Sequence, residues 1–189
     1  MHFDKVIDDY FAIVSGENTL VFIKTGRGGT VYGRDNKYLR IAKKINDKYG
    51  YTVVISANPV EYDCDLELEN DYLKKIPEIG DFINIYYIGV SNGAIIGATQ
   101  GFRIKEIQKM LLINGPLMIN YHKTVKGVKA FEGKQIDFVY GENDPSNMYT
   151  VLLENEKLCN CNVSIIQGAD HNFSGMEDVF EDMIVKWCE

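Results

Sequence analysis

The sequence predicts an α/β fold: a doubly wound, mostly parallel sheet with helices on both faces. Strand-like and helix-like segments alternate along the chain from Leu20 to the end. The strand-like segments, such as Leu20–Lys24, are apolar through and through instead of alternating between apolar and polar residues. Strands of that kind are buried on both sides, which is typical of a parallel sheet between two layers of helices.

The length and composition indicate one globular domain over residues 1–189. With 46% hydrophobic and 25% charged residues, the 189-residue chain has enough apolar side chains for a substantial core. The net charge of −7 argues against nucleic acid or an anionic membrane as the main partner. We find no apolar stretch long enough for a membrane span. The oligomeric state cannot be inferred from the sequence.

The N-terminus and the cysteines favour a cytoplasmic location. Residues 1–5 lack the charged and then apolar pattern of a secretion signal. None of the cysteines forms a C-x-x-C pair, and with three histidines in the chain we expect no zinc site. We therefore interpret all four as reduced thiols and expect neither a metal nor a cofactor. They are Cys64, Cys159, Cys161 and Cys188.

In the first half of the chain, apolar runs predict strands and helical spacing of apolar residues predicts helices. Gly50 ends the first helix and Pro77 ends the second. Residues 3–9 are weakly patterned and fit either a short helix or a strand. The expected elements are a strand Phe11–Val14, a turn Ser15–Asn18, a strand Leu20–Lys24, a helix Tyr38–Tyr49, a strand Tyr51–Ser56, a helix Asp65–Ile76 and a strand Phe82–Ile88.

The second half continues the alternation. Gly115 and Pro116 break the chain after one strand, and Pro145 suits the start of a helix. The expected elements are a helix Asn92–Gln100, a strand Met110–Asn114, a helix Tyr121–Phe131, a strand Gln135–Tyr140, a helix Ser146–Leu158, a strand Val163–Ile166 and a helix Met176–Trp187.

The segment Gly89-Val90-Ser91-Asn92-Gly93 is a G-x-S-x-G motif between a predicted strand and a predicted helix. A serine hydroxyl becomes a nucleophile only when a base takes its proton, and it has to stand clear of its own backbone. A tight strand-to-helix turn presents the side chain in this way, with strained dihedral angles at the serine. The alternative interpretation is a glycine-rich turn that only lets strand and helix pack closely.

Histidine is the best base near neutral pH, and the chain has His2, His122 and His171. His171 follows the last predicted strand, so we expect it at the carboxyl edge of the sheet, where Ser91 also lies. His2 is close to the terminus, and His122 lies at the start of a predicted helix. A loop histidine bonded to the backbone is the alternative interpretation of His171.

The acid expected to orient His171 is Asp144, which follows the preceding strand. Pro145 would begin the next helix and hold Asp144 in place. Glu142 and Asp170 are rivals. Glu142 is less well placed in the turn, and the side chain of Asp170 would usually point away from its neighbour in sequence. An aspartate before a proline is also an ordinary turn, which is the structural alternative.

Two backbone N–H groups are candidates to bind an oxyanion. One belongs to Asn92, directly after the serine, and the other to Arg27, in the glycine-rich loop Thr25–Thr30 after a predicted strand. A glycine-rich loop can also cradle a phosphate. This loop lacks the Gly-Lys-Ser/Thr ending of a P-loop and the full G-x-G-x-x-G of a dinucleotide site.

The order Ser, Asp, His, each after a strand and with an oxyanion-type loop upstream, resembles the α/β-hydrolase superfamily from Leu20 onward. Gly89–Gly93 is similar to its nucleophile elbow, Gly141–Pro145 to its acid turn, and Gly168–Phe173 to its histidine loop. Thr25-Gly26-Arg27-Gly28-Gly29 is similar to its H-G-x-G-G segment, with Thr25 in place of the usual histidine.

The resemblance implies a minimal member of that fold without a cap domain. The N-terminal antiparallel strands are reduced to one, and residues 115–134 leave room for one helix where many relatives insert a lid. We therefore expect an open, shallow site with Tyr32 and Tyr62 nearby. The sequence does not tell whether the predicted helix Tyr121–Phe131 covers it. The residues expected to contact the substrate are Gly26, Tyr121, Met148 and Phe173.

The resulting hypothesis is a serine hydrolase that cleaves a carboxylic ester or thioester of a small acyl substrate. An acyltransferase or a peptidase with the same Ser-His-Asp triad is an alternative within catalysis. A non-catalytic, ligand-binding protein of the same fold is an alternative of a different class. The sequence leaves the identity of the acyl group open.

Overall fold

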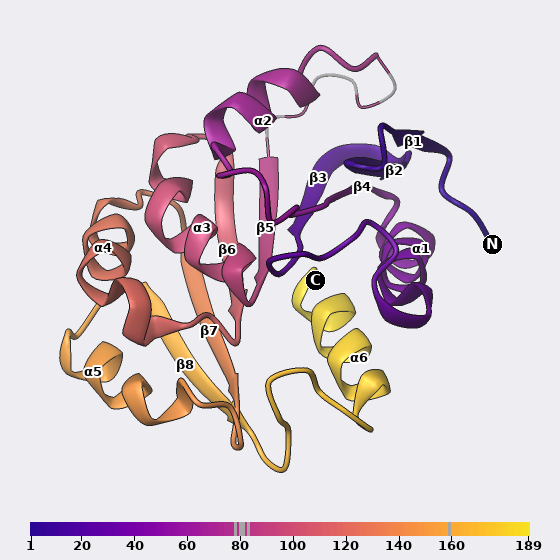
Figure 1. Cartoon of the computed structure of the whole chain (residues 1–189). Helices are drawn as coiled ribbons and strands as arrows, with labels where there is room; N and C mark the ends of the chain where they lie inside the picture. Colours follow the sequence, from indigo (N-terminus) through magenta and orange to yellow (C-terminus); the bar gives the residue numbers. More distant parts are fainter. Residues whose placement is uncertain (78, 80–81, 83, 159) are drawn as a thin grey trace.

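The computed structural model describes residues 1–77, 79, 82, 84–158 and 160–189. Within them, one eight-stranded sheet has the order β1-β2-β4-β3-β5-β6-β7-β8 (Figure 1). All pairs from β4 to β8 are parallel, whereas β1 and β2 run antiparallel at one edge. The strands are β1 (Lys5–Ile7), β2 (Phe11–Val14), β3 (Glu17–Lys24), β4 (Tyr51–Ser56), β5 (Asn84–Val90), β6 (Ile107–Ile113), β7 (Gln135–Gly141) and β8 (Cys161–Ile166).

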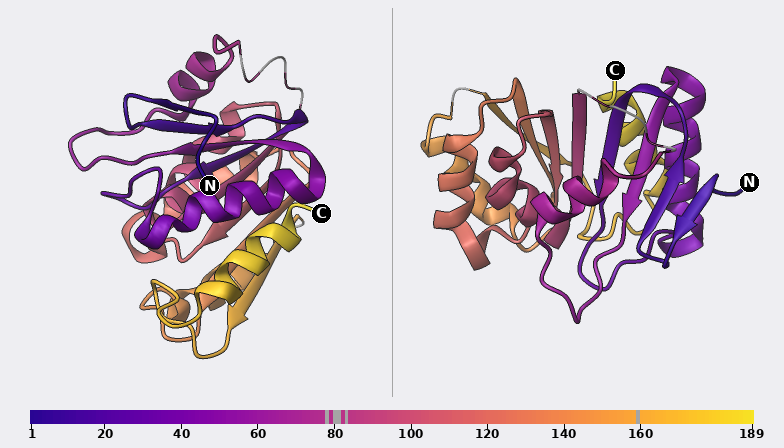
Figure 2. Two further views of the ribbon diagram at one scale, coloured as in Figure 1. Left: turned by 90° about the vertical axis from the view of Figure 1, so that its right-hand side faces the viewer. Right: turned by 90° about the horizontal axis from the view of Figure 1, so that it is seen from above.

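Helices cover both faces of this sheet, as the sequence predicts (Figure 2). On one face α1 (Lys37–Tyr49) and α6 (Glu177–Trp187) lie side by side and share a core. The helices that pack into the core of the opposite face are α2 (Leu66–Leu73), α3 (Asn92–Gln100), α4 (Leu117–Ala130) and α5 (Thr150–Asn155). No helix in the described part of the chain is long and apolar enough to cross a membrane.

The central strands are apolar throughout because successive side chains enter two different cores. In β3, Leu20 and Phe22 belong to the core under α2–α5, whereas Val21 and Ile23 belong to the core under α1 and α6. Side chains alternate between the two faces of a strand, so both sets of positions are apolar. This arrangement confirms the fold class predicted from the sequence.

The N-terminal edge corrects two expectations. The weakly patterned residues 3–9 contain β1, so two antiparallel strands precede β3 instead of one. The predicted turn Ser15–Asn18 is also shorter, because β3 already begins at Glu17. The Glu17 N–H donates a 2.7 Å hydrogen bond to the carbonyl O of Gly50, just before β4.

Three helices differ by three or more residues from their predicted bounds, and the first of them, α2, ends at Leu73 instead of Ile76. Helix α4 starts at Leu117 and is interrupted at Asn120 (φ −138°, ψ 35°), so its regular part begins where the sequence places the helix start. Helix α5 covers only Thr150–Asn155, after a 3₁₀ turn at Asn147–Tyr149, within a predicted helix that ran to Leu158. Two residues of the sequence predictions, Ile83 and Cys159, lie outside the described residues.

Candidate active site

Ser91 lies in the sharp turn between β5 and α3, with φ 54° and ψ −116°. A positive φ is uncommon for a residue with a side chain and persists only where the surroundings hold it. A Cβ atom at Gly89 would lie 2.4 Å from the carbonyl O of Gly93, and one at Gly93 would lie 2.3 Å from the carbonyl O of Lys24. Both positions therefore need glycine, because α3 packs directly against β5 and the end of β3.

The His171 ring lies between Ser91 and Asp144. Its Nε2 atom is 3.0 Å from Ser91 Oγ, and its Nδ1 atom is 2.5 Å from Asp144 Oδ2. Because an ionised carboxylate only accepts, Nδ1 donates to Asp144, and Nε2 is left to accept the Ser91 O–H. The Asp144 side chain is 1% exposed and the His171 side chain 40% exposed. The acid is thus enclosed, while the base is open to solvent.

The hydrogen bond to Asp144 raises the pKa of His171 above its ordinary value of 6.5. Burial of the ring works in the opposite direction, because it disfavours the charged imidazolium. The charges of Asp144 and Asp170 add to the upward shift of the His171 pKa.

The two rival acids, Glu142 and Asp170, bind backbone N–H groups instead of the His171 ring. Glu142 accepts a 2.8 Å hydrogen bond from the N–H of Gly168. Oδ1 of Asp170 accepts hydrogen bonds from the N–H groups of Asn172 and Ser174, each 2.9 Å long. The bonds from Ser174, above all, lower the pKa of Asp170. Both carboxylates therefore hold the acid turn and the histidine loop in shape.

Asn114, directly after β6, ties these two loops together. Its Nδ2 donates to the carbonyl O of His171 at 2.9 Å and of Asp170 at 3.3 Å. Its Oδ1 accepts the N–H of Gly141 at 2.8 Å, at the end of β7. Asn114 is buried, so these bonds are shielded from competing water. They fix the histidine loop against the strand that leads to Asp144.

The glycine-rich loop after β3 lies against Ser91. A Cβ atom at Gly26 would come within 3.2 Å of the Ser91 Cβ. Within the described residues, the backbone N–H groups of Arg27 and Asn92 donate no hydrogen bond. An N–H group without a protein acceptor next to a serine hydroxyl can bind the oxygen of a reacting carbonyl.

Asn58, buried two residues after β4, connects this loop to the serine turn. Its backbone N–H donates to the carbonyl O of Gly29 at 3.0 Å, and its own carbonyl O accepts from the N–H of Gly28 at 2.7 Å. Its side-chain Nδ2 donates to the carbonyl O of Thr25 at 3.1 Å and to Oδ1 of Asn92 at 2.9 Å. One side chain therefore holds both segments that carry the two N–H groups.

A cavity of about 310 Å³ adjoins these N–H groups. Arg27 and Asn92 line it together with residues of the 58–64 loop, of α3 and of the start of α4. Tyr62, expected near the site, is one of them. The volume of this cavity falls within the range of small-molecule sites.

None of the four expected substrate contacts is among the residues that line this cavity. The Tyr121 hydroxyl donates to the carbonyl O of Leu152 at 3.0 Å, so this side chain joins α4 to α5. Met148 is 73% exposed on the turn that follows Asp144 and does not line the cavity. Gly26, another member of the predicted set, lies against Ser91.

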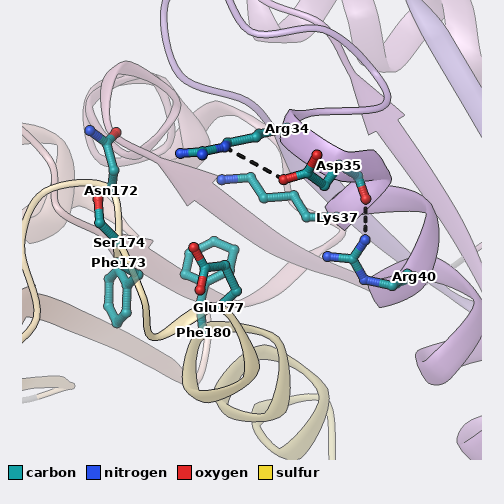
Figure 3. A pocket seen from close by; sticks show the side chains of 9 residues that line it. All are labelled: Arg34, Asp35, Lys37, Arg40, Asn172, Phe173, Ser174, Glu177 and Phe180. Atoms are coloured by element: carbon teal, nitrogen blue, oxygen red, sulfur yellow. Dashed lines mark hydrogen bonds and ion pairs between the residues drawn. The ribbon is translucent and has the colours of Figure 1, made fainter.

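Phe173 lines a second cavity, of about 280 Å³, beside the histidine loop (Figure 3). Arg34, in the 3₁₀ turn Arg34–Asn36, and Lys37, the first residue of α1, extend toward residues 172–174 in this view. The Phe173 side chain is 1% exposed and packs against the ring of Phe180, with 5.2 Å between centroids. Its main contact is therefore with the core under α6.

No protein-family model and no curated protein matches this sequence. Solved structures do match it over nearly its whole length. Est1E from Butyrivibrio proteoclasticus matches with a TM-score of 0.77 and 13% identity, over 99% of this chain and 96% of that one. A second structure of Est1E, with ferulic acid bound, also matches this chain.

Two further structures agree with this match. A monoacylglycerol lipase from Paleococcus ferrophilus has a TM-score of 0.73 and 12% identity, over 96% of this chain and 98% of that one. An alpha-beta serine hydrolase homologue from Coxiella burnetii has a TM-score of 0.68 and 17% identity, over 93% and 89%. The chain has the α/β-hydrolase fold. Within this fold it is a minimal form, since α4 alone connects β6 to β7 and no cap domain is inserted there.

Asn58 and Asn114 are the two residues of this candidate site that sequence reasoning missed. Each follows a buried strand at the carboxyl edge of the sheet, where ligands bind in open α/β folds. That position was the signal available in the sequence. An asparagine there carries both a donor and an acceptor, so it can join two neighbouring loops.

Proposed function

We propose that this chain is a serine hydrolase that cleaves a carboxylic ester or thioester through an acyl-enzyme. The Ser91 Oγ attacks the carbonyl carbon while Nε2 of His171 takes the hydroxyl proton. The N–H groups of Asn92 and Arg27 stabilise the oxyanion that forms. His171 then returns the proton to the departing alcohol or thiol.

The second half of the reaction uses the same groups. His171 takes a proton from water as the water oxygen attacks the acyl carbon, and the Ser91–acyl bond breaks. The proton returns to Ser91 Oγ and the carboxylic acid leaves. Asp144 keeps the ring in the productive tautomer and stabilises the imidazolium in both halves.

The observation that carries this proposal is the continuous arrangement of Ser91, His171 and Asp144 at a strained turn. A turn that served only for packing would need no histidine 3.0 Å from the serine hydroxyl. The structural neighbours add support, since a lipase cleaves esters and the molecule bound to Est1E is a carboxylic acid. The cytoplasmic location and the absence of nucleic-acid partners stay predictions of the sequence.

The direct test is covalent labelling of Ser91 by a fluorophosphonate probe, followed by peptide mass spectrometry. The wild type is expected to be labelled at Ser91 and to hydrolyse a short-chain chromogenic ester. Ser91→Ala should lose both, because no other group replaces the nucleophile. Ser164→Ala is the matched control, since Ser164 is an exposed serine on β8 far along the sequence from the motif.

A wild-type protein that is neither labelled nor active would exclude the covalent mechanism and favour the ligand-binding alternative. If Ser91 is labelled, product analysis with added alcohols or amines separates hydrolysis from acyl transfer. A dominant transfer product at low acceptor concentration would make the protein an acyltransferase. Peptide substrates tested in parallel address the peptidase alternative.

A further inference from the structure

The cavity lined by Arg27 and Asn92 adjoins the residues of the proposed oxyanion site. When a carbonyl oxygen binds the two N–H groups, its carbon lies at Ser91 and the rest of the acyl group extends from there. Both residues line the 310 Å³ cavity, so this space lies beside the two N–H groups that would hold the carbonyl oxygen. The inference that follows rests on the proposed function, because it describes the acyl group of that reaction.

Two cations border this cavity without an ion-pair partner among the described residues. The Arg27 guanidinium donates one hydrogen bond, 3.3 Å long, to the carbonyl O of Val60, which leaves most of its N–H donors available. Lys123, an exposed lysine on the second turn of α4, forms none of the ion pairs found among the described residues. In a protein with a net charge of −7, two such cations at one cavity favour a negatively charged ligand.

The remaining residues of the cavity offset only part of the positive charge of Arg27 and Lys123. Asp63, in the 58–64 loop, is the acidic side chain that lines it, and α3 contributes no charge. The Gln100 amide is already used, because it donates to the carbonyl O of Cys64 and accepts the N–H of Leu66. Tyr62 and Asn120 add uncharged donors to the lining, so the two cationic side chains are its positively charged groups.

The apolar part of the lining comes from Ile95 and Ile96 of α3. They can contact a short methylene chain, whereas the cations hold a charged group at its end. We propose that the preferred acyl group carries a carboxylate, which binds Arg27 and Lys123. Lys24, the other cation near this loop in the sequence, takes no part because it is buried against Glu69.

The test compares two methyl esters that differ in one group, monomethyl adipate and methyl hexanoate. A pH-stat at pH 8 gives kcat/KM for each. The charged ester is expected to be preferred about tenfold, the size of one charge-assisted hydrogen bond. Lys123→Gln should reduce this ratio, and 0.5 M NaCl should reduce it in the wild type, because salt screens exposed charges. Lys126→Gln, an exposed lysine on α4 that does not line the cavity, should leave the ratio unchanged.

A second measurement does not depend on turnover of methyl esters. Adipate should slow the fluorophosphonate labelling of Ser91 at a lower concentration than hexanoate does, and Lys123→Gln should remove that difference. Labelling of Ser91 with equal or better protection by hexanoate overturns the inference and leaves the proposed function intact. A ratio that Lys123→Gln does not change also overturns it. Absence of labelling in the wild type overturns the proposed function itself and the inference with it.

Discussion

The hydrogen bond between Asp144 and His171 couples the proposed activity to pH. The His171 ring accepts the serine proton only when it is neutral, and the bond to Asp144 raises its pKa above 6.5. As the pH falls through that raised pKa, the ring becomes protonated and kcat/KM falls. We expect an acidic limb in the pH profile of ester hydrolysis with its midpoint above 6.5. A profile that stays flat down to pH 5 would contradict His171 as the base.

Substitution of the acid tests the same hydrogen bond. Asp144→Asn removes the main cause of the raised His171 pKa and allows the wrong ring tautomer, so kcat should fall by about 10³- to 10⁴-fold. Glu142→Gln is the matched control, because Glu142 binds the N–H of Gly168, a role that an amide oxygen can also fill. Equal losses of kcat in the two variants would mean that the acid turn acts only through folding.

At the scale of elements, Asn58 is predicted to hold the two oxyanion donors at a fixed separation. Asn58→Ala removes the hydrogen bonds to Thr25 and Asn92 that join the glycine-rich loop to the start of α3. Small displacements of catalytic groups are costly, so kcat should fall by about tenfold to a hundredfold with little change in KM.

Asn46→Ala provides the matched control for this prediction. Asn46 also donates two hydrogen bonds from its side chain, to the carbonyl O atoms of Ser15 and Tyr51 at the start of β4. Its loss should lower the free energy of unfolding by a similar amount and leave kcat near the wild-type value. If both variants reduce kcat in parallel with stability, Asn58 has only a structural role.

Most elements could be predicted from the sequence because their apolar patterns agree with their burial. The interval Tyr51–Ser56 is the observed β4, and Asn92–Gln100 is the observed α3. Strand β1 was left open because its side chains are only partly buried at the sheet edge, so no clear pattern marks it. Local pattern also could not reveal that β3 extends to Glu17, since that extension depends on pairing with the distant β4.

For the candidate site, too, the sequence predicts the features that depend on local pattern and misses those that depend on distant contacts. Ser91, Asp144 and His171 could be predicted because each closely follows a strand of a parallel sheet. The carboxyl ends of such strands meet at one edge of the sheet. The surroundings of the site could not be found in this way. The sequence predicts substrate contacts for Tyr121 and Phe173, whereas it gives no sign that Tyr121 bonds to Leu152 and Phe173 packs on Phe180, since those contacts depend on packing between helices. For the same reason Asn58 and Asn114 were seen only as ends of strands.

At the scale of the whole molecule, a buried polar cluster joins the N-terminal strands to α2 directly behind the glycine-rich loop. Lys24 and Glu69 form a 2.6 Å ion pair with side-chain exposures of 0% and 8%. The Lys24 ammonium also donates to the carbonyl O of Ala57 at 2.7 Å and to Ser56 Oγ at 3.0 Å. The Tyr10 hydroxyl donates to Glu69 Oε1, and burial raises the Tyr10 pKa.

This cluster should contribute strongly to stability, because removing one partner leaves a buried charge without compensation. Glu69→Gln removes the charge opposite Lys24 and leaves one oxygen where Tyr10 and Ser56 donate to two. We expect a loss of about 3–5 kcal/mol in the free energy of unfolding. Adding Lys24→Met should recover part of that loss, since the double variant no longer buries an unpaired cation. Urea denaturation of the wild type and the three variants gives the coupling free energy.

The exposed pair of Lys74 and Glu106 is the control for this cycle. Its charged atoms are 2.7 Å apart, almost the same as in the buried pair, but the side chains are 42% and 30% exposed. Water and salt screen such a pair, so Glu106→Gln should cost about 1 kcal/mol or less. Equal losses for Glu106→Gln and Glu69→Gln would mean that burial adds nothing to the Lys24–Glu69 interaction. A much larger loss for Glu69→Gln identifies the cluster as the tie between the N-terminal strands, α2 and the loop beside Ser91.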